Sequence, residues 1–193
     1  MRNKVAEFFS SIAPKWDEME VTPPSFIDAL LARCEIKQGA RVLDLACGTG
    51  IITGRLATLT GRKVIGMDIA PKMIEIARSK YEDNPLVDFV AADFCQSDFH
   101  NDFDNIIIYN AYPHFLDRQA FLDALLKALK ENGEFAIIHS LSREALAKHH
   151  ERLENISRAL LPVEEESSFY ASCFDILQAD ESDSHYFIRA KRK

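Results

Sequence analysis

The sequence predicts an α/β fold in which a seven-stranded, mostly parallel sheet is covered by helices on both faces. After residue 40, short runs rich in β-branched residues alternate with amphipathic stretches that are long enough for crossover helices, which is typical of a parallel sheet. Near the carboxyl end, two strand-like runs flank an acidic turn and predict an antiparallel hairpin. The expected sheet therefore has five parallel strands followed by this hairpin.

Five runs of apolar residues are candidates for the parallel strands. Four of them are nearly unbroken hydrophobic segments, as expected for strands that helices bury on both faces. The runs are residues 41–46, 63–68, 87–92, 103–110 and 134–139. The two hairpin strands are expected at residues 169–178 and 185–190, on either side of the turn at 180–184.

Crossover helices are expected at residues 51–59, 71–81 and 118–130. Pro71 suits a first helical turn because proline lacks the N–H that would be unpaired there, and Asn132 with Gly133 is expected to end the third helix. A further helix is expected near residues 24–34. After the fifth strand, Ser142 is a plausible N-cap for a helix running to about Leu161, where Pro162 ends it.

The chain is expected to form a single domain, because its 193 residues contain no visible repeat or linker. Residues 40–193 would supply the sheet and its helices. Residues 1–23 belong to no expected strand and combine polar with aromatic side chains. We expect this segment to fold over an edge of the sheet.

Composition disfavours several functional classes. With 30 acidic and 23 basic side chains, the net charge is −7, which repels the phosphates of nucleic acids. No apolar run approaches the ~20 residues of a membrane helix, and Glu7 lies where a signal peptide needs its apolar stretch. We therefore expect a cytoplasmic protein with reduced, mostly buried cysteines at Cys34, Cys47, Cys95 and Cys173.

The most informative stretch is Val-Leu-Asp-Leu-Ala-Cys-Gly-Thr-Gly at residues 42–50, where an apolar strand enters a glycine turn and then a helix. Ligands of open α/β sheets bind beyond the carboxyl ends of the strands, where this turn lies. Gly48 and Gly50 allow close backbone approach to a ligand. The next glycine, Gly54, is one residue too late for a dinucleotide fingerprint, and the charge of Asp44 opposes a pyrophosphate. The turn therefore favours a cationic ligand.

Carboxylates also follow the next two strands. Asp68 lies ~20 residues beyond the glycine turn, which suits a hydrogen bond to a ribose diol. Asp93 can accept from an adenine amino group, and Phe94 can flank the ring. Each aspartate could instead cap a helix. Their order along three strands favours a ligand with amino-acid, ribose and base parts, such as S-adenosylmethionine.

With these motifs the chain resembles the class I S-adenosylmethionine-dependent methyltransferases over nearly its whole length. Leu43-Asp-Leu-Ala-Cys-Gly-Thr-Gly50 is similar to the family's glycine motif, and Leu129-Lys-Glu-Asn-Gly133 to the turn before its fifth strand. Residues 9–19, Phe-Ser-Ser-Ile-Ala-Pro-Lys-Trp-Asp-Glu-Met, resemble the opening of the quinone-biosynthesis methyltransferases, with Trp16 where those commonly carry tyrosine.

The resemblance implies a Rossmann-like fold, S-adenosylmethionine as cofactor with S-adenosylhomocysteine as product, and in-line methyl transfer to a small-molecule acceptor. It leaves the acceptor and the oligomeric state open. It also implies that residues 1–23 form a lid over the cofactor, although Trp16 could pack on the sheet edge instead. The implied cofactor-binding residues are Trp16, Asp44, Ala46, Gly48, Gly50, Asp68, Ile69, Met73, Asp93, Phe94 and Asn110.

Two histidines are candidate catalytic residues. His114 lies in the loop after the fourth strand, and His139 ends the fifth, so both belong to the ligand side of the sheet. Each could act as a general base if the acceptor must lose a proton, or could simply bond to the backbone. Methyl transfer from an activated sulfonium depends largely on alignment, so a base is not obligatory.

The other histidines and the acidic run have simpler interpretations. His149 shares an apolar helix face and is expected in the core, and His100 and His185 are expected to be solvated. A metal site built from His139, His149 and His150 is disfavoured because no ligand spacing recurs. The acidic run at residues 164–166 is expected to be a charged loop.

Three other functions compete with small-molecule methyl transfer. A noncatalytic S-adenosylmethionine-binding regulatory module would bind the cofactor without turnover. A nicotinamide oxidoreductase is disfavoured by Asp44 and the glycine spacing. Protein or RNA methylation is disfavoured by the acidic charge and the lack of an appended recognition domain.

Overall fold

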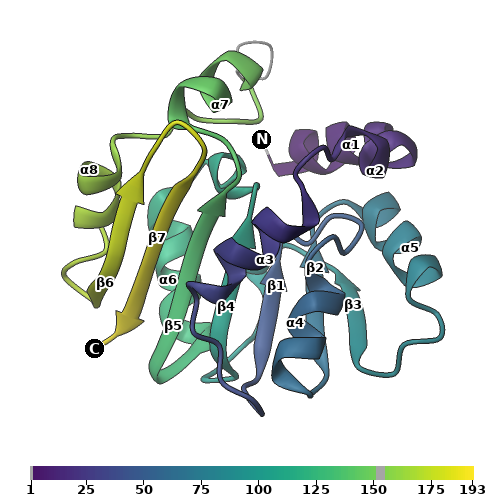
Figure 1. The fold of residues 1–193 in the computed structure, drawn as a ribbon, viewed down its shortest axis with the longest axis horizontal. Helices are drawn as coiled ribbons and strands as arrows, with labels where there is room; N and C mark the ends of the chain where they lie inside the picture. Colours follow the sequence, from purple (N-terminus) through teal and green to yellow (C-terminus); the bar gives the residue numbers. More distant parts are fainter. Residues whose placement is uncertain (1, 151–154) are drawn as a thin grey trace.

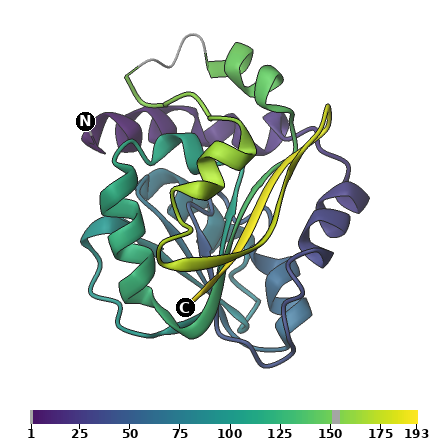
Figure 2. The same ribbon diagram turned by 90° about the vertical axis from the view of Figure 1, so that its left-hand side faces the viewer.

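The computed structural model describes residues 2–150 and 155–193, and these form a seven-stranded sheet with helices on both faces (Figures 1 and 2). The strand order is β3-β2-β1-β4-β5-β7-β6. Strands β1 to β5 are parallel, and β7 is antiparallel to both of its neighbours, which confirms the predicted sheet. The bounds are β1 Val42–Leu45, β2 Val64–Asp68, β3 Val87–Ala91, β4 Phe103–Tyr109, β5 Leu129–His139, β6 Phe174–Glu181 and β7 Tyr186–Arg192.

Two apolar clusters hold the helices against the sheet. On one face, α3 (Pro24–Ala32) and α4 (Thr53–Thr60) bury leucines and isoleucines against the central strands. On the other face, α6 (Arg118–Ala128) and α8 (Val163–Ser168) bury Phe121 and Val163 in the larger cluster. Helix α5 (Pro71–Lys80) packs Ile74 and Ala77 on Phe89 of the edge strand β3. Burial of both faces explains the apolar runs of the central strands.

Strand β5 differs from its prediction, because it begins at Leu129 and not at residue 134. Phe103 pairs with Leu129 and Asn105 with Glu134, so three extra residues of β5 are accommodated in an irregular bulge. Asn132 has a positive φ of 60° in this bulge. A Cβ at Gly133 would lie 2.9 Å from the Lys130 carbonyl oxygen, so only glycine fits there. The Asn-Gly pair therefore bends a strand and does not end the helix α6.

The helix predicted from Ser142 to about Leu161 is also shorter than expected. Helix α7 spans Arg143–His150, and residues 155–162 are not helical. Ile156 and Leu160 are nevertheless buried. Their apolar character is therefore explained by burial in non-helical chain, and not by a continuous helix. The acidic run at 164–166 lies in α8 and is not a loop, and Glu166 is fully buried. Strand β6 begins at Phe174, later than the expected residue 169.

The amino-terminal segment lies across the carboxyl edge of the parallel strands (Figure 1). It consists of α1 (Arg2–Ile12), a 3₁₀ turn (Ala13–Lys15) and α2 (Trp16–Met19), and a short connection then leads to α3. Phe9, Ile12 and Trp16 pack against Met73 of α5 and Ala70 before it. We call residues 2–19 the amino-terminal cover. Among the described residues, no helix is long and apolar enough to cross a membrane.

Candidate functional site

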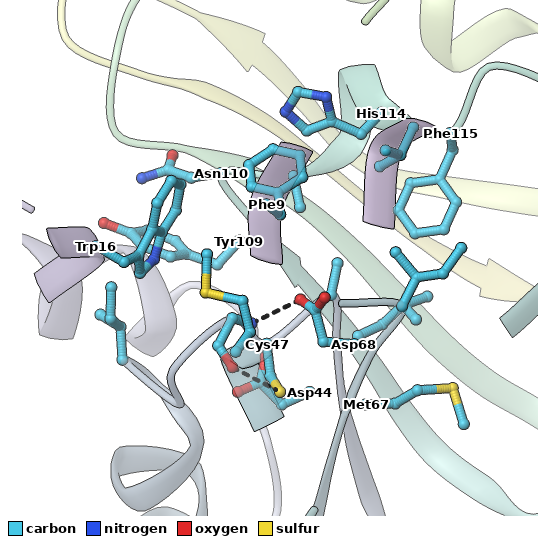
Figure 3. Close-up of a pocket in the computed structure, with 18 of the residues that line it drawn as sticks. Phe9, Trp16, Asp44, Cys47, Met67, Asp68, Tyr109, Asn110, His114 and Phe115 are labelled. Carbon is cyan, nitrogen blue, oxygen red and sulfur yellow. Dashed lines mark hydrogen bonds between the residues drawn. The ribbon is translucent and has the colours of Figure 1, made fainter. Parts of the chain in front are cut away.

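A cavity of about 1120 Å³ lies between the carboxyl ends of the strands and the amino-terminal cover (Figure 3). It is lined by eleven of the thirteen residues that the sequence analysis singled out. Gly50 and His139 are the two that do not line it. Its walls include five acidic residues, and no Lys or Arg of the described chain is among them. A cavity of this composition favours a cationic ligand over a phosphorylated one.

The glycine turn after β1 is shaped by positive φ angles at Ala46, Gly48 and Gly50. Gly48 lines the cavity, and a Cβ there would lie 3.2 Å from the indole nitrogen of Trp16, which therefore sits directly against the turn. Gly50 has another reason to be glycine. A Cβ there would come within 3.0 Å of Tyr81 and 3.1 Å of Phe89, so Gly50 allows packing behind the turn and is not part of the cavity wall.

Asp68, at the end of β2, holds the turn in place. Its carboxylate accepts hydrogen bonds from the backbone N–H of Gly48 and of Ala70, each at 2.8 Å. Burial raises the pKa of Asp68 to about 6, and the backbone N–H donors oppose this rise. Each oxygen keeps a lone pair for a ligand hydroxyl. Ile69 and Met73 line the cavity next to this carboxylate.

Asp44, on β1, is a fully buried carboxylate in the floor of the cavity. One oxygen accepts a hydrogen bond from the Thr53 hydroxyl, and the other, Oδ1, has no hydrogen-bond partner among the described residues. Burial raises its pKa to about 7, the Thr53 hydrogen bond opposes that rise, and the charge of Asp68 adds to it. A buried oxygen without a donor is costly unless a ligand supplies one. This atom therefore fits a cationic or hydrogen-donating ligand.

Asp93 and Phe94 lie at the third strand end. Asp93 caps a short 3₁₀ turn by accepting from the Cys95 N–H at 3.0 Å, so the capping role is real, and the residue also lines the cavity. Phe94 is almost fully buried against Phe121. Phe115 also packs on Phe121, which places it at this same end of the cavity.

The loop after β4, residues 110–116, borders the cavity beside the strand ends; we call it the β4 loop. Asn110 has a positive φ of 52°, and its side chain exchanges two hydrogen bonds of 2.9 Å with Ser140, one to the hydroxyl and one from the backbone. Asn110 therefore ties the ends of β4 and β5 together at the cavity wall.

His114 lines the cavity and is also bonded to the backbone. Its Nδ1 lies 2.8 Å from the carbonyl oxygen of Ile156, and its ring meets the edge of Phe9 at 4.7 Å between ring centres. A carbonyl oxygen can only accept, so Nδ1 carries the proton of the neutral ring and Nε2 carries the lone pair. His114 is thus bonded to the backbone, as one alternative expected, and also lines the cavity, as the other expected.

The structure places the other histidines in surroundings that differ from one residue to the next. His139 is fully buried beside Tyr186, its register partner on β7, and does not line the cavity. His185 is not simply solvated, since it bonds to Asp180 at 2.7 Å. His100 is exposed, as predicted. The side chains of His149 and His150 lie outside the described residues, and the rest of the described chain contains no metal-ligand cluster.

The amino-terminal cover supplies one wall of the cavity, as the expected lid of residues 1–23 implies, but of its lining residues only Trp16 was expected. Val5, Phe9 and Ile12 of α1 line the cavity at helical spacing, and Trp16 at the start of α2 continues the row. Trp16 meets Phe9 edge to face at 5.6 Å, and Phe9 in turn meets His114, so aromatic rings run from the glycine turn to the β4 loop (Figure 3). This periodicity could have identified α1 as the helix that covers the site.

Comparison with known proteins places the chain in a family. Residues 42–133 match the sequence family described as a methyltransferase domain. The ubiquinone/menaquinone biosynthesis C-methyltransferase of Coxiella burnetii is 30% identical over 171 residues, which cover 83% of this chain and 68% of that relative. The chain belongs to the class I S-adenosylmethionine-dependent methyltransferases. This methyltransferase uses S-adenosylmethionine and transfers its methyl group to a small-molecule acceptor.

Solved structures share the fold of this methyltransferase. An S-adenosylmethionine-dependent methyltransferase from Aquifex aeolicus superposes with a TM-score of 0.75 at 20% identity, over 95% of this chain and 98% of that one. A Haloferax volcanii methyltransferase, solved in complex with the activator Trm112, superposes with a TM-score of 0.81 at 19% identity, over 95% and 97% of the two chains. At such identities the likeness concerns the fold alone.

The residues of this methyltransferase fit its cofactor. Asp44 Oδ1 is buried in the cavity without a hydrogen-bond partner in the described structure, and Asp68 lines the same cavity with lone pairs that remain after it accepts from the Gly48 and Ala70 N–H groups. Both carboxylates suit a ligand with an ammonium group and a ribose, because one is an acidic acceptor for the cation and the other can accept from the sugar hydroxyls.

Proposed function

We propose that this enzyme binds S-adenosylmethionine along the ends of β1, β2 and β3, and methylates an apolar, hydroxyl-bearing ring compound beside the β4 loop. The observation that carries the proposal is the chemical difference between two halves of one cavity. The half at the strand ends contains Asp44, Asp68 and Asp93, whereas the half under α1 is lined by Phe9, Leu141 and Leu146, together with His114.

The cofactor half assigns a role to each strand end. Asp68 would accept from the ribose hydroxyls, since its lone pairs remain after the two backbone N–H donors are bound. Asp44 would face the cationic amino-acid end, and Asp93 the base. Trp16 would cover the ligand and exclude water from it, as lids of active sites do. When bound, the cofactor supplies a methyl group that is already activated by the sulfonium charge.

The acceptor half provides apolar walls and one base. The Ile156 carbonyl keeps the His114 proton on Nδ1, so Nε2 would accept a proton from an acceptor hydroxyl as the methyl group is transferred. Phe9 offers an aromatic face to a ring next to this histidine. The names of the relatives, C-methyltransferases of quinone biosynthesis, support a phenol or hydroquinone ring.

The same cavity argues against other acceptors. No Lys or Arg of the described chain lines it, so phosphorylated metabolites and nucleic acids would find no cationic partner there. His139 receives no catalytic role in this proposal, because it lies outside the cavity. We also propose that the enzyme acts in the cytoplasm, where its four free cysteines would remain reduced.

A transfer assay would test the proposal. The enzyme is incubated with S-adenosylmethionine that carries a labelled methyl group, and with two matched acceptor panels: alkyl-substituted phenols and hydroquinones, and carboxylated or phosphorylated phenols. We expect label in the apolar panel only. Equal or better transfer to the anionic panel would contradict an apolar acceptor. Calorimetry with S-adenosylhomocysteine and NAD separately tests the cofactor half, and comparable NAD binding would contradict it.

A further inference from the structure

A second group of buried charges lies behind the β4 loop, outside the cavity. At its centre is Glu166 of α8, whose side chain is fully buried. Arg158 binds both oxygens of this carboxylate, at 3.0 and 3.1 Å, and the Tyr112 hydroxyl donates to it at 2.6 Å. The Nε of Arg118 lies 3.0 Å away, and Tyr170 bonds to Tyr112. We call these five residues the Glu166 cluster.

Arg158 connects this cluster to the residues on both sides of His114. Its backbone N–H donates to the Pro113 carbonyl at 2.9 Å, and its Nε donates to the Phe115 carbonyl at 3.3 Å. Two residues earlier, the Ile156 carbonyl accepts from His114 Nδ1. Residues 156–158 therefore hold His114 by its ring and by the backbone before and after it. The guanidinium also lies 4.4 Å from the centre of the Tyr112 ring.

The charge of Glu166 is what holds Arg158 in this position. Burial alone would raise the pKa of Glu166, but the hydrogen bonds from Arg158 and Tyr112 outweigh it, so the pKa lies below its ordinary value and the carboxylate stays ionised. Desolvating such a pair costs several kcal/mol per ion, and an apolar replacement of similar volume is often as stable. Stability alone is therefore a weak reason for this cluster, whereas fixed geometry around His114 is a specific one.

We propose that Arg158, fixed by Glu166, is a positioning residue for methyl transfer that sets the orientation and tautomer of His114. This inference rests on the proposed role of His114 as the base. Misplacement of reacting groups by about 1 Å can cost a hundredfold in rate. The Glu166 cluster does not touch Asp44, Asp68 or Gly48, so cofactor binding should not depend on it.

The experiment measures the His114 tautomer directly. Two-bond ¹H–¹⁵N correlation spectra of the ¹⁵N-labelled full chain distinguish a proton on Nδ1 from one on Nε2, and His114→Gln assigns the signal. We expect the Nδ1–H form in the unmodified enzyme. Glu166→Gln removes the anchoring charge, and Arg158→Lys keeps the charge but loses the Nε donor to Phe115. Each variant should shift His114 toward the Nε2–H form or a mixture.

A matched control separates positioning from general destabilisation. Glu134→Gln breaks a comparable pair, in which Arg189 Nε donates to Glu134 at 2.7 Å, at the opposite end of the sheet from the cavity. This control should leave the His114 signal unchanged. A His114 signal that is unchanged in Arg158→Lys, or altered equally by Glu134→Gln, would overturn the inference. Arg158→Lys retains the buried charge pair and keeps the test available if Glu166→Gln does not fold.

Turnover provides the second readout and distinguishes this inference from the proposed function. With the best phenolic acceptor of the apolar panel, Arg158→Lys should lower kcat by roughly tenfold to a hundredfold, while the affinity for S-adenosylhomocysteine stays unchanged. Full turnover in His114→Gln would contradict the proposed role of His114 as the base. Lost turnover in His114→Gln, together with normal turnover in Arg158→Lys, would contradict only the positioning role.

Discussion

The two halves of the cavity are built in different ways. The cofactor half uses three consecutive strand ends between residues 44 and 94, and backbone N–H groups tie its central carboxylate, Asp68, to the glycine turn. The acceptor half gathers α1, the β4 loop and the start of α7, and residues 156–158 fasten it from outside. Acceptor contacts can therefore change while the cofactor contacts stay the same, which is how one fold serves many acceptors.

The amino-terminal cover connects the two halves. Trp16 touches the glycine turn and Phe9 touches His114, so one helical segment closes both. An ion pair of 2.6 Å between Asp17 and Lys80 of α5 fastens this cover to the body of the protein, and Thr49 of the glycine turn bonds to Asp17. The cover therefore contacts the glycine turn, beside which we propose that the cofactor binds.

The largest expected effect lies in the acceptor half. His114→Ala should lower turnover by about 10²–10⁴-fold, the usual contribution of a general base, because an acceptor hydroxyl would lose its proton partner. The affinity for S-adenosylhomocysteine, measured by calorimetry, should stay nearly unchanged. His100→Ala removes an exposed histidine and should change neither quantity. A parallel loss of turnover and affinity in His114→Ala would mean that the two halves are not separate.

The next effect lies in the cofactor half. Asp68→Ala leaves the N–H groups of Gly48 and Ala70 without their acceptor and removes the proposed ribose partner. Binding of S-adenosylhomocysteine should weaken by roughly 1–3 kcal/mol, the cost of unpaired buried groups. The exposed Asp88 of β3 offers a matched control, Asp88→Ala, with unchanged affinity. Normal affinity in a folded Asp68→Ala protein would remove this carboxylate from the site.

Protonation of Asp44 should make cofactor affinity depend on pH. Burial raises its pKa to about 7, so below that pH Asp44 loses its negative charge. Affinity for S-adenosylhomocysteine, whose ammonium group is the proposed partner, should therefore rise from pH 6 to pH 8, by at most about tenfold per pH unit. Asp44→Asn should flatten this dependence relative to the unmodified enzyme in parallel calorimetric titrations. If the affinity of Asp44→Asn still rises with pH as in the unmodified enzyme, the titrating group is not Asp44.

The stability of the ligand-free protein should change in the opposite direction. The folded state holds the Asp44 proton more tightly than the unfolded state, so this contribution to stability is present at low pH and is lost as the pH rises through about 7. Asp44→Asn should consequently raise the melting temperature of the ligand-free protein above pH 7, by an amount that shrinks toward pH 5. A lower melting temperature at pH 8 would contradict the buried charge.

The smallest expected effect concerns the cover. Lys80→Met breaks the partly exposed ion pair with Asp17, and such pairs contribute about 0.2–1 kcal/mol at most, less in high salt. Affinity for S-adenosylhomocysteine should fall slightly at low salt, and the difference should vanish at 1 M salt. Lys72→Met breaks a pair on the outer face of the same helix and serves as the control. An equal effect of the two substitutions would argue against a specific fastening.

Emission from Trp16 reports on the same cover, because this is the only tryptophan of the chain. Its indole is half-buried against the glycine turn. Titration with S-adenosylhomocysteine should shift or quench its emission in the unmodified enzyme and in Lys72→Met, with the midpoint at higher ligand concentration in Lys80→Met. Constant emission through a titration that calorimetry shows to be saturating would contradict the role of the cover.

Elements that arise from short, continuous and periodic stretches of residues were predictable from the sequence. The seven strands, the terminal hairpin and the crossover helices follow from alternating patterns within short windows. The proposed cofactor half follows for the same reason, because Asp44, Asp68 and Asp93 lie at or near the carboxyl ends of β1, β2 and β3, and the parallel topology brings those ends together. The residues of α1 that were not expected in the cavity, Val5, Phe9 and Ile12, also carry a local signal in their helical spacing.

Only the tertiary structure determines which residues form the acceptor half and which residues hold them in place. His114 lies in the loop after β4 and His139 ends β5, yet only His114 lines the cavity, whereas His139 is fully buried beside Tyr186 of β7. Glu164, Glu165 and Glu166 are identical in type, yet only Glu166 is buried, where it binds Arg158, eight residues away, and Tyr112, 54 residues away. Pairings between residues far apart in sequence leave no periodic trace, since the partners are chosen by packing. For this reason the sequence alone determined the three strand ends at which we propose that the cofactor binds, and only the folded chain decided how His114 is held.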